Sequence, residues 1–200
     1  LLGVTYISPF IALVFSFGLG AIIPYYVDLY FGISLAIQID NSFLRFVFLV
    51  LLYDFLAYWR HRLSHEIKWW WEIHKYHHSA EEFNIITSKR VHPFDIALDR
   101  IFTCVPIAIL GGFVEEYLLI ISLERLQGAF QHSMVEWDWG FIGKYFFLSP
   151  VSHRIHHSEE EEHWDTNYGH ITPLWDRLFG SWYDHHKEGG FINKEVSVKN

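Results

Sequence analysis

Three groups of histidines with helical spacing stand out along this chain of 200 residues, which contains 14 histidines. Residues three or four positions apart lie on one face of an α-helix, so the members of each group project into one volume. Helices commonly present metal ligands in this way, and the three groups together predict a metal site. The groups are His61 and His65; His74, His77 and His78; and His153, His156 and His157.

The number of these imidazoles bears on the number of metal ions. The eight side chains are more than one tetrahedral ion can use, so the set favours two ions, each bound by several neutral imidazoles. His132, which lies between the second and third groups, and His92, which precedes Pro93, are candidates to complete the two ligand sets. Imidazole suits iron, zinc and copper, so the ligands alone leave the metal open.

Residues that hold the ligands in place are expected near the third group. A ligating imidazole commonly donates its second N–H to a carboxylate or a carbonyl, which fixes the tautomer and the ring orientation. A helix cap or a surface ion pair explains the same residue types equally well, and no side chain beyond the ligands is assigned a catalytic role. The candidates are Asp165, Asn167, Asp176 and Arg177. The histidines expected at the surface or beside the ligands are His163, His170, His185 and His186.

Long apolar segments adjoin the histidine groups, in a chain that is 51% hydrophobic. Residues 1–27 contain no charged residue, and residues 4–23 are long enough to cross a hydrocarbon core of about 30 Å, which predicts a transmembrane helix. A helix in the core of a soluble protein is the less favoured alternative. Residues 42–59 form a second candidate span, in which Arg45 lies near one end and can extend to the headgroups. Asp54 lies either near the interface or inside the helix bundle, where a carboxylate would indicate a function.

A third apolar run, residues 101–114, breaks at a Gly-Gly pair and resumes over residues 117–123. This pattern predicts two helices joined by a turn, at which the side chains of Glu115 and Glu116 reach water.

All three histidine groups lie on one side of the membrane in this arrangement, because an even number of crossings returns the chain to the same aqueous face. Residues 60–98 and 149–200 share that face, and basic residues in the first of these segments assign it to the cytoplasm. The net charge of −8 excludes the basic surface that a nucleic-acid partner needs. The single cysteine, Cys104, is predicted to be a buried thiol.

The histidine groups and their surroundings resemble the fatty acid hydroxylase and sterol desaturase superfamily of membrane non-haem di-iron enzymes. The resemblance covers residues 54–182 and includes all three groups in the order and spacing of that superfamily. Ser133 and Met134 depart from the pattern, because many relatives have an asparagine after the histidine that corresponds to His132. The matching segments are residues 54–65, 74–79, 84–93, 131–133, 152–158, 165–169 and 175–180.

The resemblance implies a fold: an all-α membrane protein with about four transmembrane helices in two hairpins, below a cytosolic helical cap that carries the histidine groups. Residues 1–185 would form a single catalytic domain, followed by a tail of residues 186–200. Within that domain, the membrane helices would be residues 1–59 and about 99–131, and the cap would be residues 60–98 and 149–185.

The resemblance also implies an activity. Two iron ions held by the eight grouped histidines would use dioxygen to remove a hydrogen atom from an unactivated C–H bond, and zinc can replace iron in purified protein. His132 matches a further family histidine, whereas His92 matches only some branches, such as the sterol desaturases. The groups begin directly after apolar segments, so a fatty acyl or sterol lipid can enter from the bilayer while water is excluded. The predicted function is therefore hydroxylation or desaturation of a lipid.

Tryptophans near the histidine groups have two interpretations. They either line the apolar wall of the site or form an aromatic belt at the membrane interface. They are Trp69, Trp70, Trp71, Trp137 and Trp139.

Electrons for the predicted reaction must come from a separate donor, because the chain has neither a GxGxxG fingerprint nor a set of cysteines for an iron–sulfur cluster. A cytochrome b5-like protein, or a ferredoxin with its reductase, is the expected donor. Basic residues near the histidine groups can dock an acidic carrier, although the net charge of −8 weakens steering. The expected location is the bacterial inner membrane or the endoplasmic reticulum. The alternative function is a metal-binding membrane protein without redox chemistry, such as a zinc-dependent lipid hydrolase or a metal transporter.

Overall fold

The structure is a computed structural model that describes residues 18, 22–34, 39–80, 82–110 and 114–184. Every regular element among these residues is a helix, which confirms the all-α prediction. The chain divides into two compact units. The first unit comprises Leu1–Ala57 and Pro93–Leu123, and the second comprises Tyr58–His92 and Glu124–Asn200.

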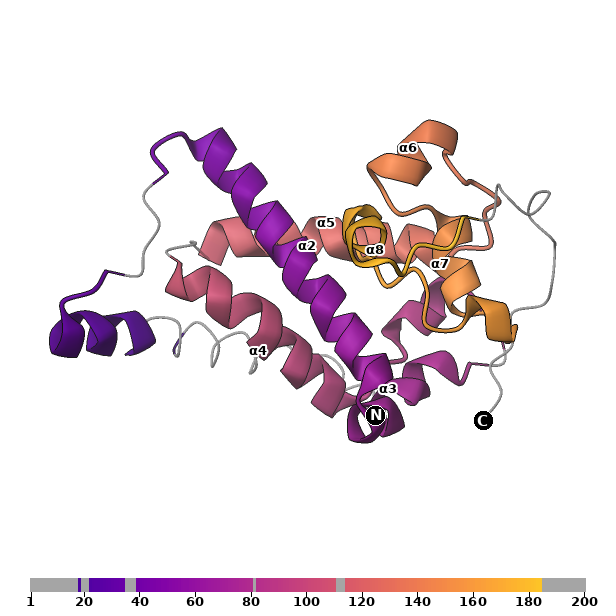
Figure 1. Cartoon of the computed structure of the whole chain (residues 1–200), viewed down its shortest axis with the longest axis horizontal. Helices are drawn as coiled ribbons and strands as arrows, with labels where there is room; N and C mark the ends of the chain where they lie inside the picture. The colour runs from indigo at the N-terminus through magenta and orange to yellow at the C-terminus, as the bar shows by residue number, and fades with distance from the viewer. Residues whose placement is uncertain (1–17, 19–21, 35–38, 81, 111–113, 185–200) are drawn as a thin grey trace. The chain divides into compact units, whose positions relative to one another are not determined.

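Three long helices account for most of the first unit (Figure 1): α2, Ser42–Glu66; α4, Pro93–Ile109; and α5, Val114–Gln131. Helices α2 and α5 each continue into the second unit. Residues 22–31 are also helical, whereas the predicted span of residues 4–23 lies almost entirely outside the described residues.

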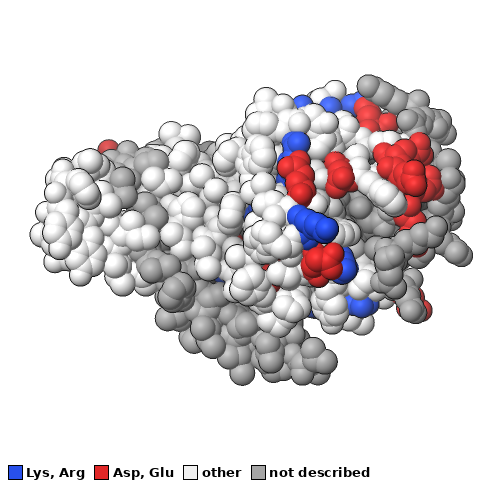
Figure 2. All heavy atoms as spheres, turned by 60° about the horizontal axis from the view of Figure 1, so that its bottom comes forward, with Lys and Arg blue, Asp and Glu red and all other residues white. Residues whose placement is uncertain are grey.

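Helix α2 contains the predicted span of residues 42–59. Within the described part of the chain it is the one helix long and apolar enough to cross a membrane. Only 28% of its most apolar window is buried, which is unlike the core helix of a soluble protein. Figure 2 shows most of the charged side chains gathered over one part of the face, while the other described atoms of that face are almost all uncharged. The length, composition and low burial of α2 make it a candidate membrane helix.

Helices α4 and α5 are separated at the predicted Gly-Gly break, since α4 ends at Ile109 and α5 begins at Val114. The hydroxyl of Tyr117 in α5 accepts a hydrogen bond from Arg100 in α4 at 3.1 Å, and its ring packs edge-on against Tyr53 of α2. Cys104 is buried, as predicted.

Charged groups in the first unit differ partly from expectation. Glu115 is exposed, but Glu116 does not simply reach water, because its carboxylate pairs with the guanidinium of Arg45 at 2.8 Å. The reason is that α2 and α5 begin beside each other. The Arg45 side chain, which was predicted to extend to the headgroups, therefore pairs with Glu116 instead. Asp54 is fully buried, which places it inside the helix bundle rather than at an exposed interface.

The second unit adds short helices to the ends of α2 and α5. Helix α7 begins with an N-cap: the Ser149 side chain accepts a hydrogen bond from Ser152 N, and Pro150 occupies the first turn. Helix α8 ends at Gly180, whose φ of 78° is the left-handed conformation of a helix C-cap. The elements are α3, Lys68–His78; η1, Ile85–Lys89; α6, Gly140–Tyr145; α7, Pro150–His156; η2, Glu161–His163; and α8, Leu174–Phe179.

Candidate metal centre

Two sets of four histidines converge within the second unit. In each set, the nearest ring nitrogens of the four side chains all lie within 4.8 Å of one another. Set one is His61, His65, His78 and His156, and set two is His77, His132, His153 and His157. Their side chains come from the end of α2, from the adjacent α3, from the residue after α5, and from α7 and its C-cap, so three separate parts of the sequence meet here.

Distances between ring nitrogens match those around a metal ion. The Nε2 atoms of His65 and His78 are 3.2 Å apart in set one. In set two, His132 Nε2 lies 3.3 Å from His77 Nε2 and 3.4 Å from His153 Nε2. Two nitrogens bound to one tetrahedral ion through bonds of about 2.0–2.1 Å are about 3.3–3.4 Å apart. These three pairs are therefore already at about the separation that a shared ion requires, and the other members of each set lie within 4.8 Å.

Backbone carbonyls fix the tautomer of three of these imidazoles. The Nδ1 atoms of His61, His156 and His132 lie 2.8, 2.7 and 2.9 Å from the carbonyl oxygens of Tyr168, Thr166 and Gly128, respectively. A carbonyl oxygen only accepts, so each Nδ1 carries the proton and donates it. The lone pair is left on Nε2, which is the atom that faces the other histidines.

Burial keeps the site neutral and leaves nitrogens for a ligand. Burial lowers the pKa of His153, His156 and His157 well below its ordinary value, and neighbouring imidazoles lower it further. Burial also lowers the pKa of His132 to about 4. The Nε2 atoms of His156 and His157 are buried with no hydrogen-bond partner among the described residues, although buried polar atoms are normally satisfied. An imidazole binds a metal in its neutral form, through a nitrogen with a free lone pair. The two sets therefore fit a di-metal site.

Two of the predicted ligands lie outside these sets. His74 is buried between them, with its ring centroid 5.1 Å from those of His61 and His78 and 5.6 Å from that of His77. His92 is not brought to the site. Its side chain is exposed and its ring faces Tyr76 at 6.5 Å, because the segment between η1 and α4 turns it away from the other histidines.

Asp165, a predicted supporting residue, contacts a ligand candidate directly. Its carboxylate lies 3.5 Å from His65 Nδ1 and accepts a hydrogen bond from the Tyr168 hydroxyl at 3.0 Å. The contact with His65 is the main cause that lowers the pKa of this carboxyl. The geometry suits a carboxylate that orients an imidazole.

Asp176 acts one step further from the histidines. Its buried carboxylate accepts hydrogen bonds from Tyr168 N and Gly169 N, both at 2.8 Å, and from the Ser181 hydroxyl at 2.7 Å. It thereby holds the backbone whose Tyr168 carbonyl accepts from His61. A Cβ at position 169 would lie 2.4 Å from the carbonyl oxygen of Thr172, so only glycine fits this close approach.

The other two predicted supporting residues do not contact the histidine sets in their described hydrogen bonds. Asn167 is fully buried, and its side chain donates to Ser152 O and accepts from Tyr183 N. Arg177 donates to Lys144 O at 2.7 Å, and its guanidinium lies over the rings of Tyr145 and Trp182. Asn167 therefore fixes the start of α7, whereas Arg177 fixes α6.

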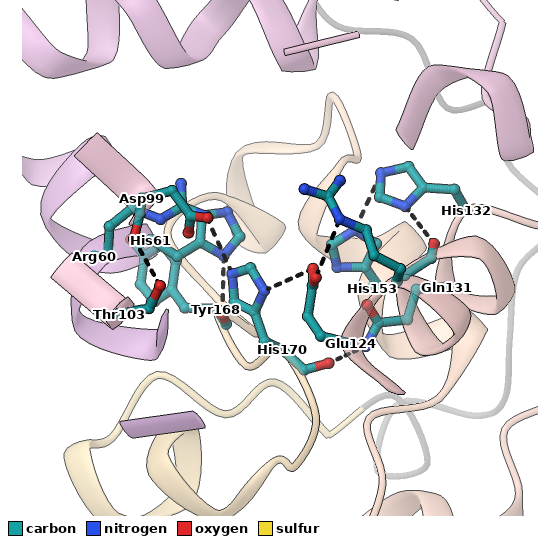
Figure 3. A network of polar contacts seen from close by, with 12 residues as sticks. Arg60, His61, Asp99, Thr103, Glu124, Gln131, His132, His153, Tyr168 and His170 are labelled. Atoms are coloured by element: carbon teal, nitrogen blue, oxygen red, sulfur yellow. Dashed lines mark hydrogen bonds and ion pairs between the residues drawn. The ribbon is translucent and has the colours of Figure 1, made fainter. Parts of the chain in front are cut away.

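A polar network lies beside set one (Figure 3); His170 was expected at the surface or beside the ligands, but its partners Glu124 and Gln131 were not singled out from the sequence. His170 packs against His61 with ring centroids 5.3 Å apart, and Glu124 Oε1 lies 3.8 Å from His170 Nδ1. Gln131 donates to the His170 carbonyl at 2.7 Å. The sequence did contain an indication of this network. Glu124, Gln127 and Gln131 are spaced i, i+3, i+7, which places them on one polar face of a helix that leads to His132.

Aromatic rings shield both sets from solvent. Trp71 lies 4.9 Å from the His65 ring, and Phe83 is stacked on His132 at 5.1 Å with an interplanar angle of 19°. Trp70 is buried, but Trp69 and Trp137 are exposed. The tryptophans thus divide between the two interpretations, since Trp71 forms part of the wall whereas Trp137 lies at the surface.

Comparison with known proteins identifies the class to which this fold and site belong. The fatty acid hydroxylase family profile matches residues 46–181, and the chain belongs to this family.

Individual relatives are lipid-modifying oxidoreductases by name. The chain is 30% identical over 131 residues to ornithine lipid hydroxylase OlsE of Rhizobium tropici, an alignment that covers 66% of this chain and 39% of the relative. It is 31% identical over 130 residues to alkylglycerol monooxygenase of Homo sapiens, covering 64% and 28% of the two chains. It is 29% identical over 149 residues to a putative Delta(7)-sterol-C5(6)-desaturase 2 of Arabidopsis thaliana, covering 70% and 50%. The chain therefore spans at most half the length of these relatives, and no solved structure matches it.

Proposed function

We propose that this chain is the catalytic part of a membrane enzyme that hydroxylates or desaturates a C–H position of a lipid, using two iron ions, dioxygen and electrons from a separate donor. The observation that carries the proposal is the pair of buried four-histidine sets, each with its ring nitrogens at metal-binding separation. Membership of the fatty acid hydroxylase family supports the reaction class. The names of the relatives support a lipid substrate.

The histidines have separate roles in this proposal. Set one and set two would each hold one ion, and His74, which lies between the sets, completes the shell of one of them. When bound, the two iron ions would supply the redox chemistry by which dioxygen removes a hydrogen atom from the lipid. Imidazole is neutral, so the ligands add no charge of their own to the centre.

Other residues of the chain hold the histidines and keep out water. Asp165 orients His65 through Nδ1, and Asp176 orients His61 by fixing the Tyr168 carbonyl. Trp71 and Phe83 cover the two sets with apolar surface. A dry wall protects a reactive centre from side reactions with solvent.

The membrane arrangement is part of the proposal. Helix α2 crosses the bilayer and delivers His61 and His65 at its end, so a lipid can reach the site from the hydrocarbon core. Four transmembrane helices in two hairpins and a cytosolic cap, in a bacterial inner membrane or the endoplasmic reticulum, complete the arrangement. A cytochrome b5-like protein, or a ferredoxin with its reductase, supplies the electrons.

Metal content is the first test, on protein purified from iron-supplemented cells. We expect about two iron ions per chain in the wild type, and loss of iron in His156→Ala. His92→Ala is the matched control, because it removes an exposed histidine outside both sets, and it should retain the metal. One zinc ion per chain under these conditions would favour the non-redox alternative, a zinc-dependent lipid hydrolase or a metal transporter, and no bound metal would contradict the proposal.

The second test is turnover with candidate lipids, dioxygen and a reductant. A product that gains one oxygen atom identifies a hydroxylase, and a product that loses two hydrogen atoms identifies a desaturase. Absence of dioxygen consumption by iron-loaded protein with every lipid class among the relatives would contradict the proposal.

A further inference from the structure

An unusually apolar surface lies on the second unit, away from the histidine sets. Six large apolar residues within eleven positions are exposed, each by 46–68% of its surface. We call them the aromatic patch: Trp137, Phe141, Ile142, Tyr145, Phe146 and Phe147. The surface of a soluble protein rarely leaves such a contiguous group uncovered, so the patch indicates contact with another apolar phase.

The patch belongs to a firmly held element. The ring of Phe141 contacts those of Tyr145 and Phe146, with centroids 5.0 and 5.8 Å apart. Helix α6 packs so closely on the preceding turn that a Cβ at Gly143 would lie 1.8 Å from Asp138 O. Arg177 holds the other side of α6 through Lys144 O. The exposed rings therefore lie on a helix whose position is fixed by its packing.

Further exposed apolar residues precede the patch in the same unit. Leu126 and Phe130 lie one turn apart on α5, and both are exposed. Exposed Met134 follows in the connection before Trp137. All three belong to the second unit, in a chain of a membrane-associated family.

The composition of the patch identifies the phase that covers it. Phe, Trp and Tyr beside cations are typical of segments that lie at the boundary between headgroups and acyl chains. The cations here are Lys144 and Arg177, and the Arg177 guanidinium lies 4.7 Å from the centre of the Tyr145 ring. A second copy of the chain would also cover apolar surface, but exposed aromatic rings beside cations, in a membrane-associated family, favour lipid.

We infer that α6 inserts its aromatic patch into the interfacial region of a lipid bilayer, as an anchor for the unit that carries the histidine sets. The inference rests on the membrane location in the proposed function but not on the iron chemistry. The aromatic patch can therefore prove to lie outside lipid while the iron-dependent activity is found, and the patch can lie in lipid while that activity is absent.

The single cysteine of the sequence makes a direct test possible. In a Cys104→Ala background, an environment-sensitive fluorophore is attached at Phe141→Cys, at Phe146→Cys and at the control Glu161→Cys. Glu161 is an exposed residue of η2 in the same unit, and Phe141 and Phe146 are outside the histidine sets. The labelled full chains are reconstituted into phosphatidylcholine vesicles with or without brominated acyl chains. If the Cys104→Ala background aggregates, Cys104 is kept, because it is fully buried and unreactive to the label.

We expect blue-shifted emission at positions 141 and 146, severalfold stronger quenching by brominated lipid than at position 161, and weaker quenching by iodide in the aqueous phase. Emission and quenching at 141 and 146 equal to those at 161 overturn the inference. Protection from iodide without quenching by brominated lipid also overturns it. In that case, loss of protection as the protein is diluted in lipid would identify a second copy of the chain as the occupant.

Discussion

Asp176→Asn separates a role in metal binding from a role in folding. The Asp176 carboxylate accepts hydrogen bonds from two backbone N–H groups and from the Ser181 hydroxyl, and none of these three partners is a histidine. An asparagine can keep its oxygen toward Tyr168 N and Ser181, but its NH2 group then faces Gly169 N, donor against donor. One buried donor left unsatisfied costs about 1–3 kcal/mol of stability.

The same change reaches the metal through one carbonyl. Tyr168 N binds Asp176 and Tyr168 O binds His61 Nδ1, so a shift of this residue misorients one ligand of set one. Residues that orient a ligating histidine typically contribute about 10–100-fold to metal affinity. This range corresponds to about 1.4–2.8 kcal/mol, which is similar to the cost of the unsatisfied donor.

Two measurements on detergent-solubilised protein distinguish the roles. Competition with a chromogenic chelator gives the affinity of each ion, and thermal unfolding of the metal-free protein gives stability. We expect Asp176→Asn to weaken one of the two ions by about 10–100-fold and to leave the other nearly unchanged. Asp184→Asn is the control, because Asp184 pairs with Lys144 at 2.8 Å and its loss should lower stability alone. A destabilised Asp176→Asn protein with wild-type affinity for both ions would refute the reasoning.

Three further predictions concern the same centre. Asp165→Asn should reduce metal affinity or activity by about 10–100-fold, as measured by titration and turnover, because it weakens the contact that orients His65; unchanged values would remove that role. Phe83→Ala should raise the dioxygen consumed per lipid product while metal content stays the same, since it uncovers the His132 ring to water; an unchanged ratio would count against shielding. Chelation should lower the melting temperature of the wild type by more than that of His156→Ala, which retains set two alone, because a ligand that binds only the folded state stabilises it; equal shifts in both proteins would contradict binding at set one.

Local periodicity explains how much of the site was predictable. The i, i+3, i+4 spacing correctly placed the members of each group on one helix face, because that relation depends only on helix geometry. Their division between two sets depends on how helices pack, and no spacing encodes it. His77 and His78 belong to the same group in the sequence but to different sets in the structure. His132 was found because it lies close to other ligands in the fold as well as in the chain, whereas His92 is close only in the chain.

The supporting residues show a similar limit. Residue type and position singled out Asp165 and Asp176, but only the structure shows that one touches an imidazole and the other acts through a carbonyl. Glu124 and His170 meet from segments 46 positions apart in the sequence, as the numbering shows. The all-α class followed from apolar spans and helical spacing. The pairing of Arg45 with Glu116 needed the knowledge that two helices begin side by side.

The adjacent members of the histidine groups have a consequence for how the centre is assembled. His77 and His78 belong to different sets, and so do His156 and His157. Two peptide bonds, one in α3 and one at the end of α7, therefore link the two ion positions, and the spacing between the ions is set by rigid backbone rather than by adjustable side chains. A movement of either backbone segment therefore displaces one ligand of each set together. Deleting one residue of α3 ahead of His77 should accordingly disturb both ion positions at once.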